Sequence, residues 1–328
     1  MVLYDVVIVG GGAAGLTAAL YSARQGLKTL VVTMDIGGQA VLTPHIENYP
    51  GVGVVSGLEL AERLREQAES FGAEFIYDKA VKIEDTGENL LLIHTRSSGV
   101  YEALAVILAF GKTPRPLGVP GEERLVGKGV SYCAVCDAPL FRGRRVIVVG
   151  AGDPAVEAAL LLCRYGNAVS IVQRGSSVVA NEQLIGECVK NRVEVITSTV
   201  VKEIKGEAKV EAVVLQNIKT GEEQEVKVDG VFVEMGYAAQ TDWVKDLVVL
   251  NNNGEIVTNK LAETSHPGIF AAGDVTDMPY KQFIISAGEG AVAALSAYNY
   301  IARLRGRPAV KTDWKALKKE ESGFKLEL

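Results

Sequence analysis

The chain has 328 residues, 48% of them hydrophobic and 23% charged, with a formal net charge of −6 at pH 7. This length and composition allow a full buried core and predict about two domains. Nucleic acid is disfavoured as a partner, because phosphate binding requires a basic face and no cluster of Lys and Arg provides one. The longest apolar runs, such as Leu104–Phe110, are far below the roughly 18 residues of a membrane span. No secretory or transit segment is visible, so we expect a cytoplasmic protein that binds no membrane.

The four cysteines fall into two groups. Cys163 and Cys188 lie in apolar helical patterns, where a thiol is usually a buried structural side chain. Cys133 and Cys136 flank Ala-Val, and this spacing lets two sulfurs form a disulfide that exchanges readily with other thiols. Zinc would need further Cys or His ligands at metal spacing, and the sequence has none. We therefore expect a redox-active pair and no metal.

An internal repeat gives the strongest sign of domain organisation. The sequence VGGGAAGLTAALYSARQGLKTLVVT at residues 9–33 matches VGAGDPAVEAALLLCRYGNAVSIVQ at residues 149–173, 140 positions later. Each copy begins in an apolar strand, at Asp5–Val9 or Arg145–Val149. It then turns through G-x-G-x-x-G/A into an Ala- and Leu-rich helix and ends in a second apolar strand. Each copy is therefore predicted to be a βαβ unit.

The glycine turns predict two dinucleotide-binding sites. The first glycine allows a tight turn, the second lets a pyrophosphate approach the backbone, and the third small residue packs the helix onto the strand. The phosphates then lie at the helix N-terminus, where backbone N–H groups point outward. The residues in these positions are Gly10, Gly12 and Gly15 in the first copy and Gly150, Gly152 and Ala155 in the second.

The rest of the sequence places the second unit inside the first. A helical pattern at 58–71 precedes strand-like stretches near 73–84, 89–95 and 100–109, and residues 112–118 form a Pro- and Gly-containing linker. A second crossing is expected near 236–243, before strand patterns at 256–258 and 268–272 and a long helix that ends near Arg305. We therefore predict an α/β fold of two Rossmann-like dinucleotide-binding domains, the second inserted into the first. Residues 1–115 and 244–328 would form the first domain, and residues 116–243, with the cysteine pair, the second.

Disulfide exchange also needs a proton carrier near the sulfurs. Asp137 directly follows the cysteine pair and is the obvious candidate. The three histidines are His45, His94 and His266, so none lies in the last 62 residues to act as a C-terminal acid. The alternative for an aspartate in this place is a turn cap.

Together these motifs resemble the low-molecular-weight thioredoxin reductases, over roughly residues 3–305. The matching stretches are VGGGAAG at 9–15, GGQ at 37–39, IENYPG at 46–51, PRPLGVPGE at 114–122, GVSYCAVCD at 129–137, AAGDV at 271–275 and AGEG at 287–290. No single stretch is specific, but their combination is.

The resemblance implies that the first repeat holds FAD. A helix expected to start near Ser286 would direct its positive end toward the flavin and favour the electron-rich reduced ring. Gln39 and Asn48 are two of the implied flavin contacts. Because polar residues beside glycines also stabilise turns, the alternative is that these two side chains do so here. The implied FAD-binding residues are Gly10, Gly12, Ala13, Ala14 and Gly15 at the pyrophosphate, Gly38, Gln39 and Asn48 at the flavin, and Asp274, Gln282 and Phe283 at the ribityl–phosphate and ring region.

The resemblance also implies roles at the cysteine pair. Cys136 would exchange electrons with the flavin, Cys133 would exchange with thioredoxin or a thioredoxin-like protein, and Asp137 would handle protons. The inserted domain of this family swings, and the linkers near 112–118 and 236–246 would supply the hinge. A homodimer follows from the resemblance alone.

Three segments depart from the family pattern. The chain has Ala-Pro-Leu at 138–140, where a glycine usually follows the aspartate, and Pro154 replaces a serine at a helix start. The family commonly has His-Arg-Arg and a later Arg for the 2′-phosphate of NADPH, where this chain has Gln173, Arg174, Gly175 and Val179. Only Arg174 is left as a phosphate contact. We therefore expect NADPH or NADH with weak preference, or a ferredoxin or deazaflavin as the main reductant.

Three functions fit the sequence. The first is a thioredoxin-disulfide reductase. The second is an oxygen-dependent dithiol oxidase on the same scaffold, which would form peroxide and have a decayed nicotinamide site, although the second glycine turn is intact. The third is a non-catalytic flavin redox module, which would bind FAD without turning over any protein disulfide.

Overall fold

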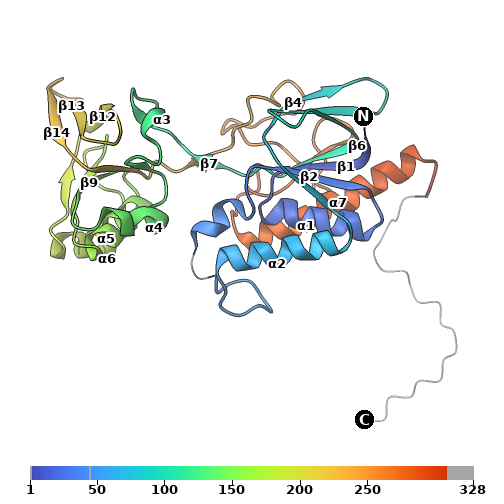
Figure 1. Ribbon diagram of the computed structural model, residues 1–328, viewed down its shortest axis with the longest axis horizontal. Coiled ribbons are helices and arrows are strands. Elements are labelled where there is room, and N and C mark those ends of the chain that lie inside the picture. The colour runs from blue at the N-terminus through green and yellow to red at the C-terminus, as the bar shows by residue number, and fades with distance from the viewer. Residues whose placement is uncertain (1, 44–45, 309–328) are drawn as a thin grey trace, which may run out of the picture.

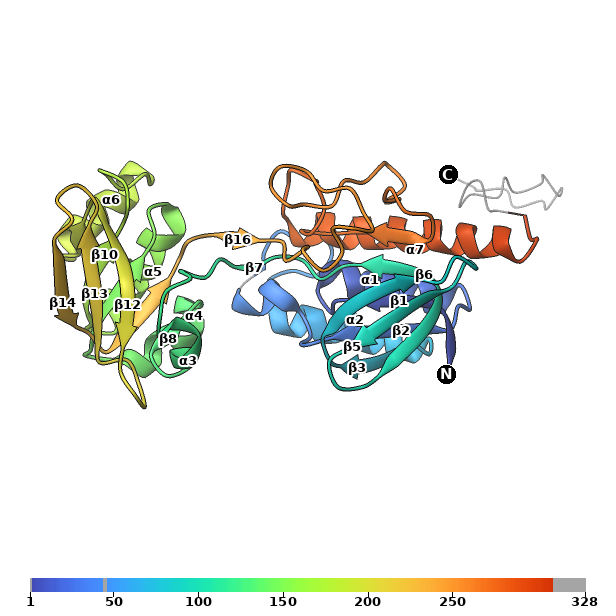
Figure 2. The ribbon, with the colours of Figure 1, turned by 90° about the horizontal axis from the view of Figure 1, so that it is seen from above.

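The computed structural model describes residues 2–43 and 46–308. The described chain forms two α/β domains, each built around a largely parallel sheet, which two extended segments join (Figures 1 and 2). The first domain contains both ends of the described chain, and the second is inserted between its parts. The predicted fold class is confirmed. The expectation for residues 309–328, in the last part of the first domain, lies outside the described residues.

The sheet of the first domain has the order β3-β2-β1-β6-β5-β4, with β17 also paired to β6. Its parallel strands are β1 (Leu3–Val9), β2 (Thr29–Thr33), β3 (Glu74–Tyr77), β6 (Val100–Leu108) and β17 (Ile269–Ala271). The antiparallel strands β4 (Ala80–Asp85) and β5 (Leu91–Thr95) extend this sheet. The strand pattern predicted near 73–84 is thus two separate strands.

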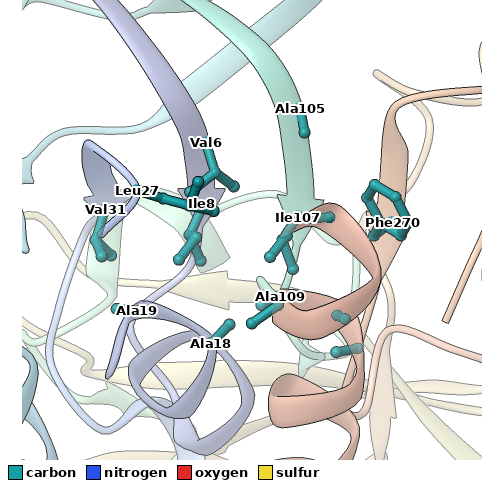
Figure 3. Close-up of a cluster of buried hydrophobic side chains, with 14 of the residues drawn as sticks. Val6, Ile8, Ala18, Ala19, Leu27, Val31, Ala105, Ile107, Ala109 and Phe270 are labelled. Atoms are coloured by element: carbon teal, nitrogen blue, oxygen red, sulfur yellow. The ribbon is translucent and has the colours of Figure 1, made fainter. Parts of the chain in front are cut away.

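Alternating side chains of the central strand bury both faces of the sheet. Val6 and Ile8 of β1 point toward helices α1 (Ala13–Arg24) and α7 (Phe283–Leu304), where Figure 3 shows them with Ile107 of β6. Val7 and Val9 point to the opposite face and pack with β4, β5 and the segment around Val248. This period of two is what a strand covered on both sides requires.

Small residues let the helices approach the first glycine turn. Gly10 has φ +113°, and a Cβ there would lie 2.4 Å from the carbonyl oxygen of Ala109. A Cβ on Gly15 would lie 1.9 Å from the carbonyl oxygen of Gly10, so only glycine fits where α1 crosses β1. Gly290 of α7 packs just as closely against α1, because a Cβ on Gly290 would lie 2.1 Å from the carbonyl oxygen of Ala14.

The second domain repeats this plan with a smaller sheet, in the order β11-β10-β9-β15-β8. Its parallel strands are β8 (Val130–Ser131), β9 (Arg145–Val149), β10 (Ala168–Val172), β11 (Glu194–Ile196) and β15 (Gly230–Val233). Helices α4 (Ala134–Asp137), α5 (Asp153–Arg164) and α6 (Glu182–Lys190) cover one face. The other face packs against an antiparallel sheet of β12 (Thr199–Lys205), β13 (Ala212–Asn217) and β14 (Glu223–Lys227). Two short helices also belong to this part of the chain, α3 (Glu122–Leu125) and η2 (Ala138–Phe141).

The first domain has two further helices, the short η1 (Gly38–Leu42) and the fourteen-residue α2 (Gly57–Ser70).

The two linkers pair with each other between the domains. Strand β7 (Thr113–Pro114) is antiparallel to β16 (Tyr237–Ala238), as the extended segments in Figure 2 show. On the side of the second domain, the Glu122 carboxylate accepts hydrogen bonds of 2.7 Å from the backbone N–H groups of Leu117 and Gly118. The linkers thus lie where the sequence predicts them, and the exact domain boundaries at 115/116 and 243/244 stay predictions.

Two predicted elements differ in the structure. Residues 256–258 form no named strand, and Ile256 instead makes isolated bridges to Leu250 and Thr276. Helix α7 begins at Phe283, three residues before the expected Ser286. Among the described residues, no helix is long and apolar enough to cross a membrane.

The contact of α1 with α7 predicts opposite effects for two glycines of α7. Gly290→Ala should lower the free energy of unfolding by about 1–3 kcal/mol, because its methyl group overlaps the Ala14 backbone. Gly288→Ala should raise it by about 0.5–1 kcal/mol, because Gly288 is exposed and a methyl group there meets nothing within 4 Å. Denaturant unfolding of both variants, at fixed saturating FAD, measures the two values. Equal effects would show that the close α1–α7 contact does not constrain the fold.

Candidate functional site

A cavity of about 1260 Å³ extends from the first glycine turn to the cysteine pair, so residues of both domains line it. Strands β1, β2 and β6 end at this cavity, as expected for ligand sites at the carboxyl edge of a parallel sheet. Gly15, by contrast, lies behind the turn against Gly10. The predicted FAD-binding residues at the cavity are Gly10, Gly12, Ala13, Ala14, Gly38, Gln39, Asn48, Asp274, Gln282 and Phe283.

Hydrogen bonds connect cavity residues that are far apart in the sequence. The Gln39 side-chain amide donates to the Lys112 carbonyl oxygen at 3.1 Å and to the Asp274 carboxylate at 3.4 Å. The Asn48 amide donates to the Gln282 side-chain oxygen at 3.1 Å. Ser286 Oγ donates to Asp274 Oδ1 at 3.1 Å. Gln39 and Asn48, which could also serve turns, therefore each hydrogen-bond to a cavity residue more than 200 positions away in the sequence.

Asp35 is a cavity residue that the sequence analysis missed. It follows β2 and lines the cavity, and its Oδ1 accepts a hydrogen bond of 3.0 Å from the Gly38 backbone N–H. Its position, about 20 residues after the glycine turn, is where a Rossmann fold carries an acid for a ribose hydroxyl. That spacing could have identified it.

Two further missed residues, Lys112 and Lys281, bring positive charge to the cavity. The Glu255 carboxylate lies 2.7 Å from Lys112 Nζ and 3.4 Å from Lys281 Nζ. Burial raises the pKa of Glu255, but hydrogen bonds from Lys112 and Asn251 and the charge of Lys281 outweigh it and bring this pKa to about 2. Glu255 is therefore ionised at neutral pH and holds both lysines, one of which directly precedes the β7 linker.

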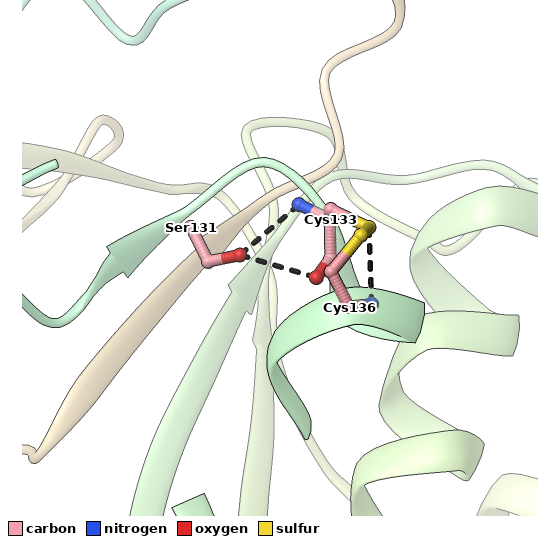
Figure 4. The surroundings of a disulfide bond; sticks show 3 residues. All are labelled: Ser131, Cys133 and Cys136. Atoms are coloured by element: carbon pink, nitrogen blue, oxygen red, sulfur yellow. Dashed lines mark hydrogen bonds between the residues drawn. A yellow bond between two sulfur atoms is a disulfide. The ribbon is translucent and has the colours of Figure 1, made fainter. Parts of the chain in front are cut away.

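Cys133 and Cys136 form a disulfide, with their Cα atoms 5.3 Å apart (Figure 4). Cys133 caps α4, and its sulfur accepts a hydrogen bond of 3.0 Å from the Cys136 backbone N–H. Ser131 Oγ accepts from the Cys133 N–H at 3.0 Å and donates to the Cys133 carbonyl oxygen at 3.2 Å. The disulfide thus follows β8 and includes Cys136 of α4, a helix on the side of the second domain toward the first (Figure 1).

The two sulfurs are not equivalent. Cys133 is half-buried and lines the large cavity, whereas Cys136 is exposed and does not line it. Asp137 is half-buried and lies at the large cavity and also at a smaller one of about 290 Å³, near Lys128 and Arg144. Its carboxylate makes no hydrogen bond or ion pair with the part of the chain that the structure describes. Asp137 therefore lies at two cavities without a side-chain partner among the described residues.

The other two cysteines pack in the core of the second domain. Cys188 is buried and Cys163 half-buried between α5 and α6. Burial raises the pKa of both thiols, which keeps them protonated and unreactive at neutral pH. Residues 2–43 and 46–308 contain no cluster of Cys, His, Asp and Glu that could hold a metal ion.

The second glycine turn has the geometry of a dinucleotide site. The residues after β10, where such a site distinguishes NAD from NADP, offer few polar or charged groups. Gly150 and Gly152 follow β9, and a Cβ on Gly150 would lie 2.8 Å from the Ala155 methyl group. At the end of β10, Gln173 is 3% exposed, and its Nε2 has no hydrogen-bond partner among the described residues. Arg174 and Val179 are exposed. The residues after β10 thus offer one guanidinium and one unpaired amide, and no acid.

Comparisons with known proteins agree with this geometry. The family model of the pyridine nucleotide-disulphide oxidoreductases matches residues 4–295. The chain belongs to this family and is, within it, a flavin-dependent disulfide oxidoreductase of the thioredoxin reductase type. Use of a flavin and a nicotinamide dinucleotide is general in the family.

The relatives carry this assignment over almost the whole chain. Thioredoxin reductase from Treponema pallidum is 41% identical over 306 residues, which cover 92% of this chain and 98% of the relative. The crystal structure of Lactococcus lactis thioredoxin reductase in its FR conformation has a TM-score of 0.77 and 39% identity, and covers 92% of this chain and 99% of its own. A ferredoxin-flavin thioredoxin reductase from Clostridium acetobutylicum has a TM-score of 0.53 and 30% identity, covering 94% and 100%.

Proposed function

We propose that this chain reduces the disulfide of thioredoxin or a thioredoxin-like protein, with electrons that pass from a reduced donor through FAD to the Cys133–Cys136 pair. The observation that carries this proposal is the shared cavity, in which Cys133 lies with ten of the eleven predicted FAD-binding residues. A structural disulfide would have no reason to lie there. An FAD-binding module without turnover would not need a disulfide at the cavity either.

The residues around the cavity fit FAD. A Cβ on Gly10 would clash with Ala109, and a Cβ on Gly11 would clash with Asp35. The absence of side chains at both positions also allows the close approach of a pyrophosphate to the backbone. When bound, FAD accepts two electrons and can pass them to a disulfide. Asp35 would hold a ribose hydroxyl, and Lys112 and Lys281 would stabilise negative charge on the reduced ring. The N-terminus of α7, at Phe283, adds a partial positive charge at the same cavity.

The cysteine roles require domain motion. The resemblance assigns Cys136 to the flavin and Cys133 to the partner, whereas Cys133 is the sulfur that lines the cavity here. We propose that rotation about β7 and β16 brings Cys136 to the flavin and then exposes Cys133 to the partner, with Asp137 as the proton carrier. The paired linkers support such a rotation, because only two short strands connect the domains.

The surface near the disulfide suits a protein partner. Val135, at 49% exposed, and Leu140, at 77%, present apolar side chains on either side of Cys136. Lys128 and Arg144 border the small cavity beside them. An exposed apolar patch with a polar rim is typical of a docking site. We therefore propose that the thioredoxin-like partner binds here. The family resemblance supports a homodimer and a cytoplasmic location as further parts of the proposal.

For the electron donor, we propose a nicotinamide nucleotide without strong preference for NADPH. A 2′-phosphate would meet Arg174 alone, because Gly175 and Val179 replace two arginines. Each hydrogen bond to a charged group contributes about 1.5–3 kcal/mol, so two lost contacts remove about 3–6 kcal/mol of discrimination. The buried amide of Gln173 can serve a ribose hydroxyl as well as a phosphate. The Clostridium relative is named a ferredoxin-flavin thioredoxin reductase, so a ferredoxin or a deazaflavin is the donor to test beside the nucleotides.

Replacing either cysteine should abolish the reductase activity. Cys133→Ser and Cys136→Ser should each lower thioredoxin-dependent turnover by at least a hundredfold and leave FAD bound, because an exchange relay fails without either sulfur. Turnover, together with mass identification of the flavin released by heat, measures both effects. Cys163→Ser is the matched control and should keep full activity, since its thiol only packs against the core. Full activity in either active-pair variant, or a flavin other than FAD, would contradict the proposal.

The donor proposal predicts similar use of NADPH and NADH. Stopped-flow bleaching of the flavin with NADPH, NADH and a reduced ferredoxin or deazaflavin should give affinities for the two nucleotides within about tenfold of each other, because the two missing arginines would have supplied two to four powers of ten. Restoring them with Gly175→Arg and Val179→Arg should favour NADPH. A preference for NADPH of a thousandfold or more in the natural chain would contradict the proposal.

A further inference from the structure

Three charged side chains form a nearly buried cluster beside the large cavity. Glu255 Oε1 lies 2.7 Å from Lys112 Nζ and 3.4 Å from Lys281 Nζ, and the Glu255 side chain is 11% exposed. Lys281 Nζ also donates a hydrogen bond of 2.7 Å to the Thr276 carbonyl oxygen. Asn251 Nδ2 donates to the second carboxylate oxygen of Glu255 at 2.8 Å. We call Lys112, Glu255 and Lys281 the charge cluster.

The charge cluster carries one uncompensated positive charge. Its two ammonium groups share a single carboxylate, which leaves a net charge of +1. Both lysines line the cavity, whereas Glu255 does not and lies behind them. Because a buried charge is costly unless it is paired, the excess positive charge favours a negatively charged group in the cavity.

The charge cluster lies at the end of the cavity toward the second domain. Lys112 directly precedes Thr113 and Pro114 of β7, which also line the cavity and lead to the second domain (Figure 2). Lys281 lies two residues before the start of α7, at Phe283. Cys133 belongs to the second domain and lines the same cavity. Electrons can pass between FAD and the disulfide only if the reacting ring lies at this end, beside the cluster.

We propose that Glu255 is a positioning residue that limits the positive charge beside the flavin, so that a reduced flavin still gives its electrons to the disulfide. This inference rests on the proposed function, in which FAD and the Cys133–Cys136 pair exchange electrons. Two electrons and one proton convert the uncharged oxidised ring into a reduced ring with one negative charge, which nearby ammonium groups stabilise. Two unopposed lysines would hold the electrons on the ring. By compensating one of them, Glu255 keeps the ring reducible by the donor and oxidisable by the disulfide.

Electrons, protons and charge balance in this transfer. The reduced ring gives up two electrons and one proton, the S–S bond breaks, and the two sulfurs take up both electrons and that proton. One sulfur becomes a thiol and the other a thiolate, which then attacks the partner disulfide. No further oxidant or reductant takes part.

The test changes the net charge of the cluster by one unit at a time. It uses the full-length holoprotein with Cys133 and Cys136 both replaced by Ser, so that the electrons stay on FAD. The equilibrium constant for flavin reduction is measured against a dye of known potential at pH 7. Glu255→Gln raises the net charge to +2 and should increase this constant by at least about tenfold, which is about 30 mV for a two-electron couple. The amide oxygen of Gln can still accept a hydrogen bond from Lys112.

Removing a lysine should have the opposite effect. Lys112→Met and Lys281→Met each lower the net charge to zero and should decrease the constant by a similar factor, so the result does not depend on one variant. The double variant of Lys112→Met with Glu255→Gln returns to +1 and should restore the value of the unmodified cluster within about threefold. With the natural cysteines present, Glu255→Gln should also lower the ratio of dithiol to disulfide, measured by alkylation after two electrons are added per FAD.

The control variant removes a carboxylate elsewhere in the same domain. Glu84 pairs with Lys82 at 2.7 Å and does not line the cavity, so Glu84→Gln should leave the constant unchanged. Asp274 at the cavity and Glu289, which accepts a hydrogen bond of 2.8 Å from the Gly273 backbone N–H, are the same in every variant. Differences between the variants therefore report the charge cluster alone.

Two results would overturn the inference. Single variants that all shift the constant in the same direction, or a double variant that does not return to the starting value, would show that the cluster acts through the structure of the site instead of its charge. Either result would leave the reductase proposal intact. Folded protein that binds no FAD would contradict the inference and the proposed function together.

Discussion

A disulfide can take electrons from a flavin only when the two are in contact, and in this chain the proposed flavin site and the Cys133–Cys136 disulfide belong to different domains. Each site lies at the carboxyl edge of a parallel sheet, so the two edges must face each other. The antiparallel pairing of β7 with β16 holds them in this arrangement. Both ends of the first linker are fixed. Lys112 forms an ion pair with Glu255 at one end, and the backbone N–H groups of Leu117 and Gly118 donate hydrogen bonds to Glu122 at the other. Any change of orientation is therefore concentrated in the few linker residues between these anchors.

The repeated βαβ units, the nested arrangement and the linker positions could be predicted from the sequence, because each follows from a local pattern. Hydrophobic periodicity and glycine turns depend on residues that are close in the chain. The resemblance then named ten residues that line one cavity, although Gly15 packs behind the turn instead. The strand expected at 256–258 was wrong, because Ile256 makes only single bridges to segments that no local pattern reveals.

The residues that sequence reasoning missed have in common that their roles arise from distant contacts. Lys112 and Lys281 are ordinary lysines in sequence, and Glu255 brings them together at the cavity. Asp35 alone had a usable signal, its spacing from the glycine turn. Charge at a site built from two domains is therefore the least predictable part of this molecule.

The central claim is that electrons pass from the flavin through Cys133 and Cys136 to a partner protein. Its most direct measurement is mass-spectrometric mapping of alkylated cysteines, first after anaerobic reduction of the flavin and again after addition of oxidised thioredoxin. We predict that both cysteines become alkylated once the flavin is reduced, and that thioredoxin removes this labelling as its own thiols appear. A flavin that is fully reduced while Cys133 and Cys136 stay protected as a disulfide would contradict it.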